Sequence, residues 1–181
     1  VAKFQFTANS AGYSGMCLRF DSHCDGGALC NDQTMKGKSD ILMTPTVVVD
    51  GNVMVSFWYR NPAGGEFAVY ASRDNGATYL SNIVLEPVTG VANWTLCQVA
   101  VPANAGDKFK LVFVATSNAS DPKYPAYIYL DEVKIEDVPT CAKPVRLAVS
   151  EATPTEVILS WQTVANAGAA PSFFTLDLYA N

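Results

Sequence analysis

The sequence predicts an all-β protein whose larger part is a jelly-roll β-sandwich. Short apolar or alternating segments follow one another along the chain, as β-strands do, and no segment has a convincing helical pattern. Gly, Pro, Asn and Asp gather between these segments, in clusters such as Asp50-Gly51-Asn52 and Asp74-Asn75-Gly76. Such clusters supply the tight turns that neighbouring antiparallel strands need.

Eight segments of the larger part have the alternation and the β-branched or aromatic content of strands. In chain order they are residues 16–20, 41–49, 53–59, 66–72, 78–86, 95–101, 108–116 and 126–135. About eight short strands at this spacing are typical of a two-sheet sandwich of the jelly-roll type.

Residues 53–60 alternate between two rows of side chains. The row that we expect to face the core consists of Val53, Val55, Phe57 and Tyr59. The other row consists of Met54, Ser56, Trp58 and Arg60. If this second row lines an exposed sheet or cleft, Trp58 can stack on a sugar ring while Arg60 bonds its hydroxyls, joined by Tyr70 from the next strand. The alternative is that both rows pack against other parts of the protein.

The turn at residues 72–79 matches the Ser-x-Asp-x-Gly-x-Thr-aromatic pattern of an Asp box, with Tyr79 in place of the usual Trp. We expect a hairpin turn that stabilises the fold, in which Asp74 and Thr78 bond backbone groups and Asn75-Gly76 accommodates positive φ. Sialidase activity does not follow from this pattern.

The strand at residues 126–135 contains an unexpected acid. Strict alternation places Asp131 in one row with Val133 and Ile135. If that row faces the core, the carboxylate must be compensated, because a buried unpaired charge is costly. A bound cation is one solution, and hydrogen bonds from backbone N–H groups or an arginine such as Arg19 are the other.

Charge and hydropathy exclude several classes of partner. The 181 residues include 12 Lys and Arg against 17 Asp and Glu, for a formal net charge of -5, so we expect no binding to nucleic acid. No apolar run approaches the roughly 18 residues of a membrane span, and the first residues do not resemble a signal peptide. We therefore expect no membrane insertion, and we expect a mature product or an excised segment of a larger multidomain chain.

Cysteine usage indicates an oxidising compartment and therefore a secreted or cell-surface protein. Three of the five cysteines lie within residues 17–30. Together with His23 they could suggest zinc, but they lack the short ligand pairs of structural zinc sites. A disulfide between Cys24 and Cys30 is the better interpretation.

The other three cysteines leave more than one arrangement open. Cys17 and Cys97 both fall in predicted strands and can pair or remain buried thiols. Cys141 is then the odd thiol.

Catalysis is the weaker hypothesis. His23 is the only histidine, so a Ser-His or Cys-His system has one possible base, and no G-x-S-x-G, phosphate-binding or metalloprotease motif occurs. Asp131 and Glu132 are not expected to form a glycosidase pair, because neighbours on a regular strand point to opposite faces.

The pattern changes near residue 140. Two prolines flank Cys141 within residues 137–144, and a new series of strands follows at 144–151, 156–162 and 173–180. We expect one domain over residues 1–139 and a second, truncated one over 140–181, because three strands are too few for a sandwich of about seven.

The order of motifs resembles a specific family. CLRF, LMTP, VSFWYR, VYASRDNGATY, Trp94, FKLVFVAT and IYLDEVKI follow one another as in the MAM-like, galactose-binding-like jelly rolls of bacterial surface proteins. That group includes the cleaved-adhesin domains of gingipain-type proteases and the choice-of-anchor J domains. Residues 141–161, CAKPVRLAVSEATPTEVILSW, are similar to the start of an immunoglobulin-like fibronectin type III module, with Trp161 in the place of its core tryptophan.

The resemblance implies a function and a cofactor. It implies a non-catalytic extracellular module for adhesion that binds a carbohydrate or a host extracellular protein. One alternative is a structural accessory domain of a larger secreted hydrolase or protease. A glycosidase is the less favoured alternative. It also implies a structural Ca²⁺ site at Asp131, with Asp40 and Asp21 as candidate further ligands. Ca²⁺ takes 6 to 8 oxygen ligands and accepts carboxylates and carbonyls alike.

Overall fold

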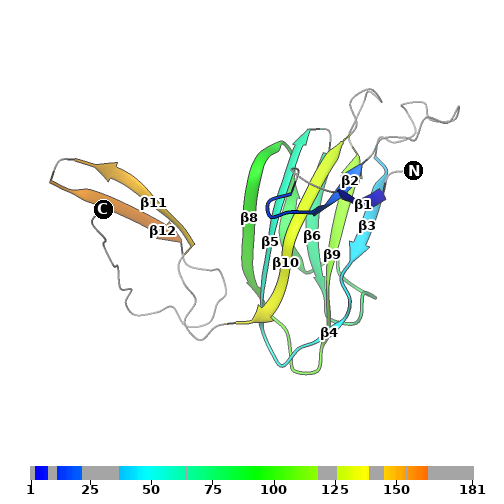
Figure 1. Cartoon of the computed structure of the whole chain (residues 1–181). Helices are drawn as coiled ribbons and strands as arrows, with labels where there is room; N and C mark the ends of the chain where they lie inside the picture. The colour runs from blue at the N-terminus through cyan, green and yellow to red at the C-terminus, as the bar shows by residue number, and fades with distance from the viewer. Residues whose placement is uncertain are drawn as a thin grey trace, which may run out of the picture.

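Two antiparallel five-stranded sheets form a β-sandwich in the computed structural model of the chain (Figure 1). The structure describes residues 3–7, 12–21, 37–63, 65–117, 126–138, 145–153 and 155–162. The first sheet has the order β1-β2-β10-β5-β8. Its strands are β1 (Lys3–Thr7), β2 (Cys17–Asp21), β10 (Tyr127–Asp137), β5 (Val53–Ala63) and β8 (Val91–Val101).

The second sheet has the order β3-β9-β6-β7, and the short strand β4 pairs with β9. Its strands are β3 (Ser39–Met43), β9 (Lys108–Ser117), β6 (Gly65–Ser72), β7 (Ile83–Val88) and β4 (Val47–Val48). Strands β11 (Val145–Ala152) and β12 (Val157–Gln162) form a separate two-stranded sheet. All these pairings are antiparallel, so the all-β jelly-roll prediction is confirmed.

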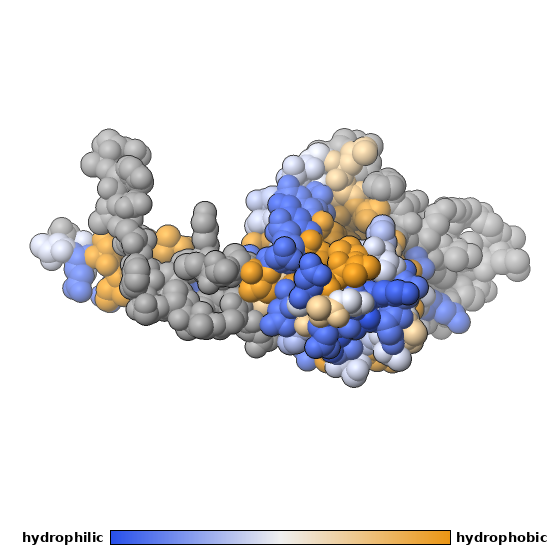
Figure 2. Space-filling model, turned by 90° about the horizontal axis from the view of Figure 1, so that it is seen from below, coloured by the Kyte–Doolittle hydropathy of each residue, from blue (hydrophilic) through white to orange (hydrophobic). Residues whose placement is uncertain are grey.

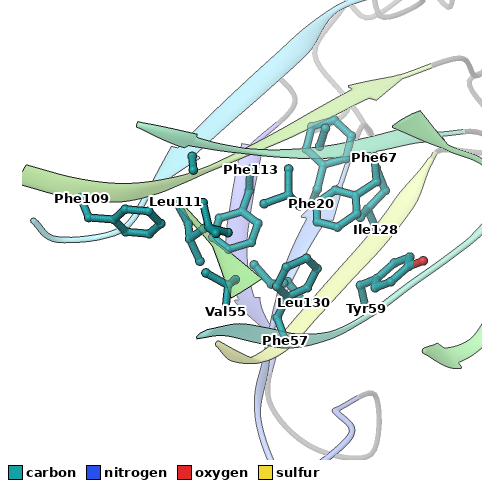
Figure 3. Packing of buried hydrophobic residues seen from close by; sticks show 14 of the residues in the cluster. Phe20, Val55, Phe57, Tyr59, Phe67, Phe109, Leu111, Phe113, Ile128 and Leu130 are labelled. Carbon is teal, nitrogen blue, oxygen red and sulfur yellow. The ribbon is translucent and has the colours of Figure 1, made fainter. Parts of the chain in front are cut away.

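Aromatic side chains fill the centre of the sandwich (Figure 3). Phe57 of β5 points at Phe67 of β6 and Phe113 of β9, and its ring stands nearly perpendicular to both, at centroid distances of 6.4 and 5.6 Å. The Phe67 and Phe113 rings are almost parallel, 6.3 Å apart. All three side chains are buried, and burying one Phe stabilises the fold by about 1.5–3 kcal/mol.

The strand predictions hold best in the middle of the chain. The predicted strand 41–49 is divided into β3 and β4, with Pro45 between them, because proline cannot donate to a ladder. The predicted strand 78–86 begins only at Ile83, because the preceding residues form the turn after β6. The first strand, β1, was missed. The expected boundary near residue 140 and the expected strand 173–180 lie outside the described residues.

Strand β10 contains a β-bulge that reverses its alternation. Asp131 pairs with Trp58 of β5, but the next pair is Lys134 with Ser56, so β10 has one extra residue there. Glu132, in the bulge, has a positive φ of 47°. The expectation that Asp131 shares a row with Val133 is therefore wrong: Val133 packs against the core, whereas Asp131 lies opposite Trp58 on the outer face.

The surface of the sandwich is not uniformly polar. Figure 2 shows the end at which β4 lies in Figure 1, and hydrophobic atoms gather there between hydrophilic regions. Val48 of β4 is 66% exposed. Among the residues that the structure describes, no helix has the length and apolar character of a membrane span.

Candidate functional site

The outer face of the first sheet carries the candidate site. The predicted core row of β5 is buried, which confirms that Trp58 and Arg60 belong to the opposite row. Leu96 of β8 and Asp131 of β10 lie directly opposite Trp58 on either side, and Tyr129 lies opposite Arg60. Three neighbouring strands therefore bring these side chains together.

Aromatic rings form a cluster on this face. Tyr13, which precedes β2, stacks on Trp58 with centroids 3.9 Å apart and an interplanar angle of 13°. The Tyr13 ring also meets Trp94 of β8 edge-on at 6.2 Å, and Trp94 in turn meets Tyr129 at 6.3 Å. One face of the Trp58 indole is thus covered by another ring, so Trp58 is neither a fully open platform nor fully buried.

Arg60 is held among these rings. Its guanidinium carbon lies 4.3 Å from the centre of the Tyr129 ring and 5.4 Å from that of Trp94. Cation–π contacts of this kind are worth about 0.5–2 kcal/mol. Its Nε is buried and has no hydrogen-bond partner within the described ranges. Arg60 therefore contacts two rings of the aromatic cluster at once.

A hollow of about 240 Å³ adjoins the cluster along the strands. It is lined by Ser56, Trp58, Leu96, Gln98, Glu132, Lys134 and Glu136. One wall is aromatic, and the others offer a hydroxyl, an amide, an ammonium and two carboxylates. A small site that joins an apolar wall with several hydrogen-bonding groups is suited to a small polar ligand.

Asp131 is compensated by backbone N–H groups. Its Oδ2 accepts a hydrogen bond from the N–H of Ser14 at 2.9 Å, and its Oδ1 accepts one from the N–H of Glu132 at 2.8 Å. The sequence left open a bound cation or hydrogen bonds as compensation for this charge, and the described contacts are hydrogen bonds from backbone N–H groups. The carboxylate thereby joins β10 to residues 12–16, the turn that carries Tyr13.

The three predicted calcium ligands do not converge. Asp21 pairs with Tyr127, four residues along β10 from Asp131, which corresponds to about 13 Å at 3.3 Å per residue. Its carboxylate forms a 3.0 Å ion pair with Arg19. Asp40 lies in β3 of the other sheet. Ligands of one Ca²⁺ must all lie about 2.3–2.6 Å from the ion, so these three cannot share one.

Metal ligands also do not gather elsewhere in the described parts of the chain. No group of three or more His, Cys, Asp or Glu side chains there is placed to hold a metal ion. The Ca²⁺ prediction thus has no fitting set of ligands in the part of the protein that the structure describes.

Tyr70 does not join Trp58. The sequence placed it on the strand next to β5, but β6 belongs to the second sheet. There Tyr70 pairs with Val112 of β9, and its ring contacts Tyr79 at 5.9 Å. The chain crosses from one sheet to the other between β5 and β6, so consecutive strands are not neighbours.

The two described cysteines lie on opposite sides of one sheet and do not form a disulfide with each other. Cys97 lies opposite Phe57 and packs against the core. Cys17 is buried on the other side, and burial, followed by the negative charge of Asp131, raises the pKa of its thiol. The proposed Cys24–Cys30 disulfide lies outside the described residues, as do His23 and Cys141.

Asp131 and Glu132 lie on the same face of the sheet. The expectation that these neighbours point to opposite faces is wrong, because the bulge turns Glu132 to the outer face, where it lines the hollow. Asp131 is nevertheless engaged, since each of its oxygens accepts a backbone N–H. The two acids do not offer a pair of free carboxylates.

Sequence reasoning missed most of the residues around Trp58. Tyr13, Trp94 and Tyr129 were not assigned to the site, because their positions depend on the pairing of β5 with β8 and β10. Alternation does place Tyr129 in one row with Asp131, which was the available signal. Nothing in the sequence indicates that Tyr13 folds over β5.

No family model and no curated protein matches the chain. Among solved structures, the K1 cleaved adhesin domain of Lys-gingipain from Porphyromonas gingivalis W83 is 28% identical, with 70% of this chain and 78% of that chain covered and a TM-score of 0.46. The CBM22-1 xylan-binding domain of Paenibacillus barcinonensis Xyn10C is 20% identical, with 75% and 80% covered and a TM-score of 0.45.

A third similar structure is the arabinose-bound MgGH51 α-L-arabinofuranosidase. It is 15% identical and covers 75% of this chain, with a TM-score of 0.50. This chain corresponds to only 22% of that enzyme, so the likeness concerns the β-sandwich and not the enzyme's activity. The similar structures thus include carbohydrate-binding and cleaved-adhesin domains as well as part of a glycosidase.

Proposed function

We propose that the sandwich is a non-catalytic module that binds a glycan in the hollow beside Trp58. The observation that carries this proposal is the composition of the hollow, whose lining combines the Trp58 indole and Leu96 with several hydrogen-bonding side chains. A sugar ring has apolar C–H faces that pack on aromatic rings and hydroxyls that need donors and acceptors. Trp58 supplies the aromatic ring, and Ser56, Gln98 and Lys134 supply hydrogen-bond donors and acceptors.

The charges of the lining favour a neutral glycan. Glu132 and Glu136 flank Lys134 along β10, so both signs of charge are present and acids are in excess. A uronate or sulfate would be repelled by the two carboxylates, whereas a hydroxyl can donate to them and accept from the ammonium.

Adhesion is the role that we propose for this binding. The module would belong to a secreted or cell-surface bacterial protein, and its partner would be a glycan or a glycan-bearing host extracellular protein. Residues 140–181 would form the start of a fibronectin type III domain in a larger chain. Several large apolar side chains of the hairpin are exposed, and this supports a domain that further strands complete: Leu147, Val149, Val157, Ile158 and Trp161.

The proposal is tested with a glycan array and calorimetry on the whole chain. We expect binding to one or more neutral oligosaccharides, and a loss of about tenfold or more in affinity for Trp58→Ala, corresponding to about 1.4 kcal/mol. Tyr70→Ala is the matched control, because it removes an aromatic side chain from the other sheet. Equal affinity losses in the two variants would contradict the proposed site.

Two other outcomes would identify the alternatives. If no glycan or matrix protein binds, a structural accessory domain of a larger secreted hydrolase or protease is the better interpretation. Hydrolysis of a chromogenic glycoside, abolished by Glu132→Gln or Glu136→Gln, would instead identify a glycosidase, because both carboxylates line the hollow.

A further inference from the structure

Trp58 has different neighbours on its two sides along β5. Ser56 precedes it in the outer row and lines the hollow, whereas Arg60 follows it and lies with Trp94. Tyr13 contacts both Trp58 and Trp94, so it lies toward Arg60 and does not line the hollow. The indole that forms a wall of the hollow is thus backed by the Tyr13 ring.

The turn that carries Tyr13 is held by one carboxylate. The N–H of Ser14, the next residue, donates to Asp131 Oδ2 at 2.9 Å, although the two residues are 117 positions apart in the chain. The other oxygen accepts the N–H of Glu132 within the bulge. Asp131 therefore bonds the turn and the bulged strand at the same time.

The turn is also packed tightly against this carboxylate. A Cβ atom on Gly12 would lie 2.3 Å from the carbonyl oxygen of Gly15 and 3.3 Å from Asp131 Oδ2. Gly15 has a φ of +77°, which side chains rarely adopt. Both glycines allow residues 12–16 to close over Asp131, and this closure places Tyr13 on Trp58.

An aspartate suits this position better than its amide. An ionised carboxylate only accepts hydrogen bonds and can accept from both N–H groups, whereas an asparagine would direct its NH₂ at one of the two donors. Hydrogen bonds to an ionised acceptor are also roughly twice as strong as neutral ones. The acid in the sequence AYIYLDEVKI thus serves as the acceptor for two backbone N–H groups.

We propose that Asp131 is a positioning residue for the hollow: it fixes the turn 12–16 so that Tyr13 braces Trp58. The consequence for ligand binding rests on the proposed glycan site, but the brace itself does not. A wall held in place before the ligand arrives lowers the cost of binding, since fewer side chains must be ordered on association.

The brace is measured without any ligand by ¹⁹F NMR of the whole chain labelled with 5-fluorotryptophan. We assign the Trp58 resonance with Trp58→Phe. We expect it to shift in Tyr13→Ala and to shift in the same direction in Asp131→Asn, while the chemical shift of Trp161 does not change. Tyr79→Ala is the control, because its ring lies at the second sheet beside Tyr70. An unmoved Trp58 resonance in folded Asp131→Asn overturns the proposal. If that variant does not fold, Ser14→Pro removes the N–H donor and keeps the carboxylate, and the same criterion applies.

Affinity for the best neutral oligosaccharide of the array provides the second measurement. We expect Tyr13→Ala and Asp131→Asn each to weaken binding about three- to tenfold. Because both act on the same brace, the double variant should have the same affinity as the single variant that binds less tightly. Additive losses, or tighter binding by Tyr13→Ala, overturn the proposal. If the wild-type chain binds no glycan, the proposed function fails, and the ¹⁹F shifts alone decide whether the brace exists.

Discussion

At the scale of single residues, Asp74 shows how a short motif becomes a rigid turn. Its Oδ1 accepts from the Ser72 hydroxyl at 2.7 Å and the Thr78 N–H at 2.9 Å, and its Oδ2 accepts from the Thr78 hydroxyl at 2.6 Å. This confirms that the segment is a hairpin device with Asn75 at positive φ. The bonds from Thr78, followed by that from Ser72, lower the pKa of Asp74 from 3.8 to about 2.

Asp74→Asn should lower the melting temperature near neutral pH, and the difference from wild type should shrink in acid. Because the folded-state pKa is depressed, the stabilisation is fully present above the ordinary pKa and is lost as pH falls through about 2. Thermal melts between pH 2 and pH 6 measure this, with the exposed Asp50→Asn as control. A difference that stays constant down to pH 2 would contradict the assignment.

The sequence predicted residues well where alternation is regular and poorly where it is interrupted. Trp58 and Arg60 fell on the expected outer row because β5 is regular at this point. Asp131 did not fall on its expected row, because one extra residue in β10 is invisible to a rule of period two. Tyr13 could not be predicted, since its contact with β5 depends on a turn closed by a distant carboxylate.

At the scale of elements, strand existence was easier to predict than strand pairing. Most central strands have the expected places, but Tyr70 was placed beside Trp58 on the assumption that consecutive strands are neighbours. In a jelly roll, connections often cross between sheets, and β5 to β6 is such a crossing. Sequence patterns identify which residues face inward but not which strand lies alongside.

Asn61 holds the crossing from β5 to β6 together. The side chain is fully buried, and its amide donates to the carbonyls of Val88 at 2.8 Å and Gly65 at 3.3 Å, while its oxygen accepts from the N–H of Val91 at 3.0 Å. One side chain thus bonds residues of β6, β7 and β8. Buried backbone groups that lose such a partner cost about 1–3 kcal/mol each.

Asn61→Ala should therefore reduce the free energy of unfolding by about 2 kcal/mol or more. Urea denaturation followed by circular dichroism measures the change. Asn93→Ala is the matched control, because Asn93 is exposed on β8 and should give a change within about 0.5 kcal/mol. Similar values for the two variants would show that the buried amide does not hold this crossing.

At the scale of the whole molecule, the arrangement of carboxylates makes a prediction about calcium. Asp131, Asp21 and Asp40 do not converge, and Asp131 already bonds two N–H groups. We expect the change in melting temperature between 5 mM EDTA and 5 mM CaCl₂ to be the same in Asp131→Asn as in wild type, within about 1 °C, because only an ion that binds the native state through Asp131 would make the two differ. A clear rise with calcium that is absent in Asp131→Asn would restore the calcium site inferred from the family resemblance.

The sandwich should also be stable without the C-terminal hairpin. All the described residues of the buried core cluster lie between Phe20 and Leu130, and no described residue of the hairpin β11–β12 belongs to it. Removing residues 140–181 should therefore leave the melting temperature of the sandwich within about 2 °C of the whole chain, since stability follows buried apolar area. Binding of a hydrophobic dye should fall, because the removed hairpin exposes apolar side chains such as Val149 and Val157. Differential scanning calorimetry measures the melting temperature, and dye fluorescence measures the exposed apolar surface. A fall of more than about 5 °C in the melting temperature would show that the two parts form one cooperative unit rather than separate domains.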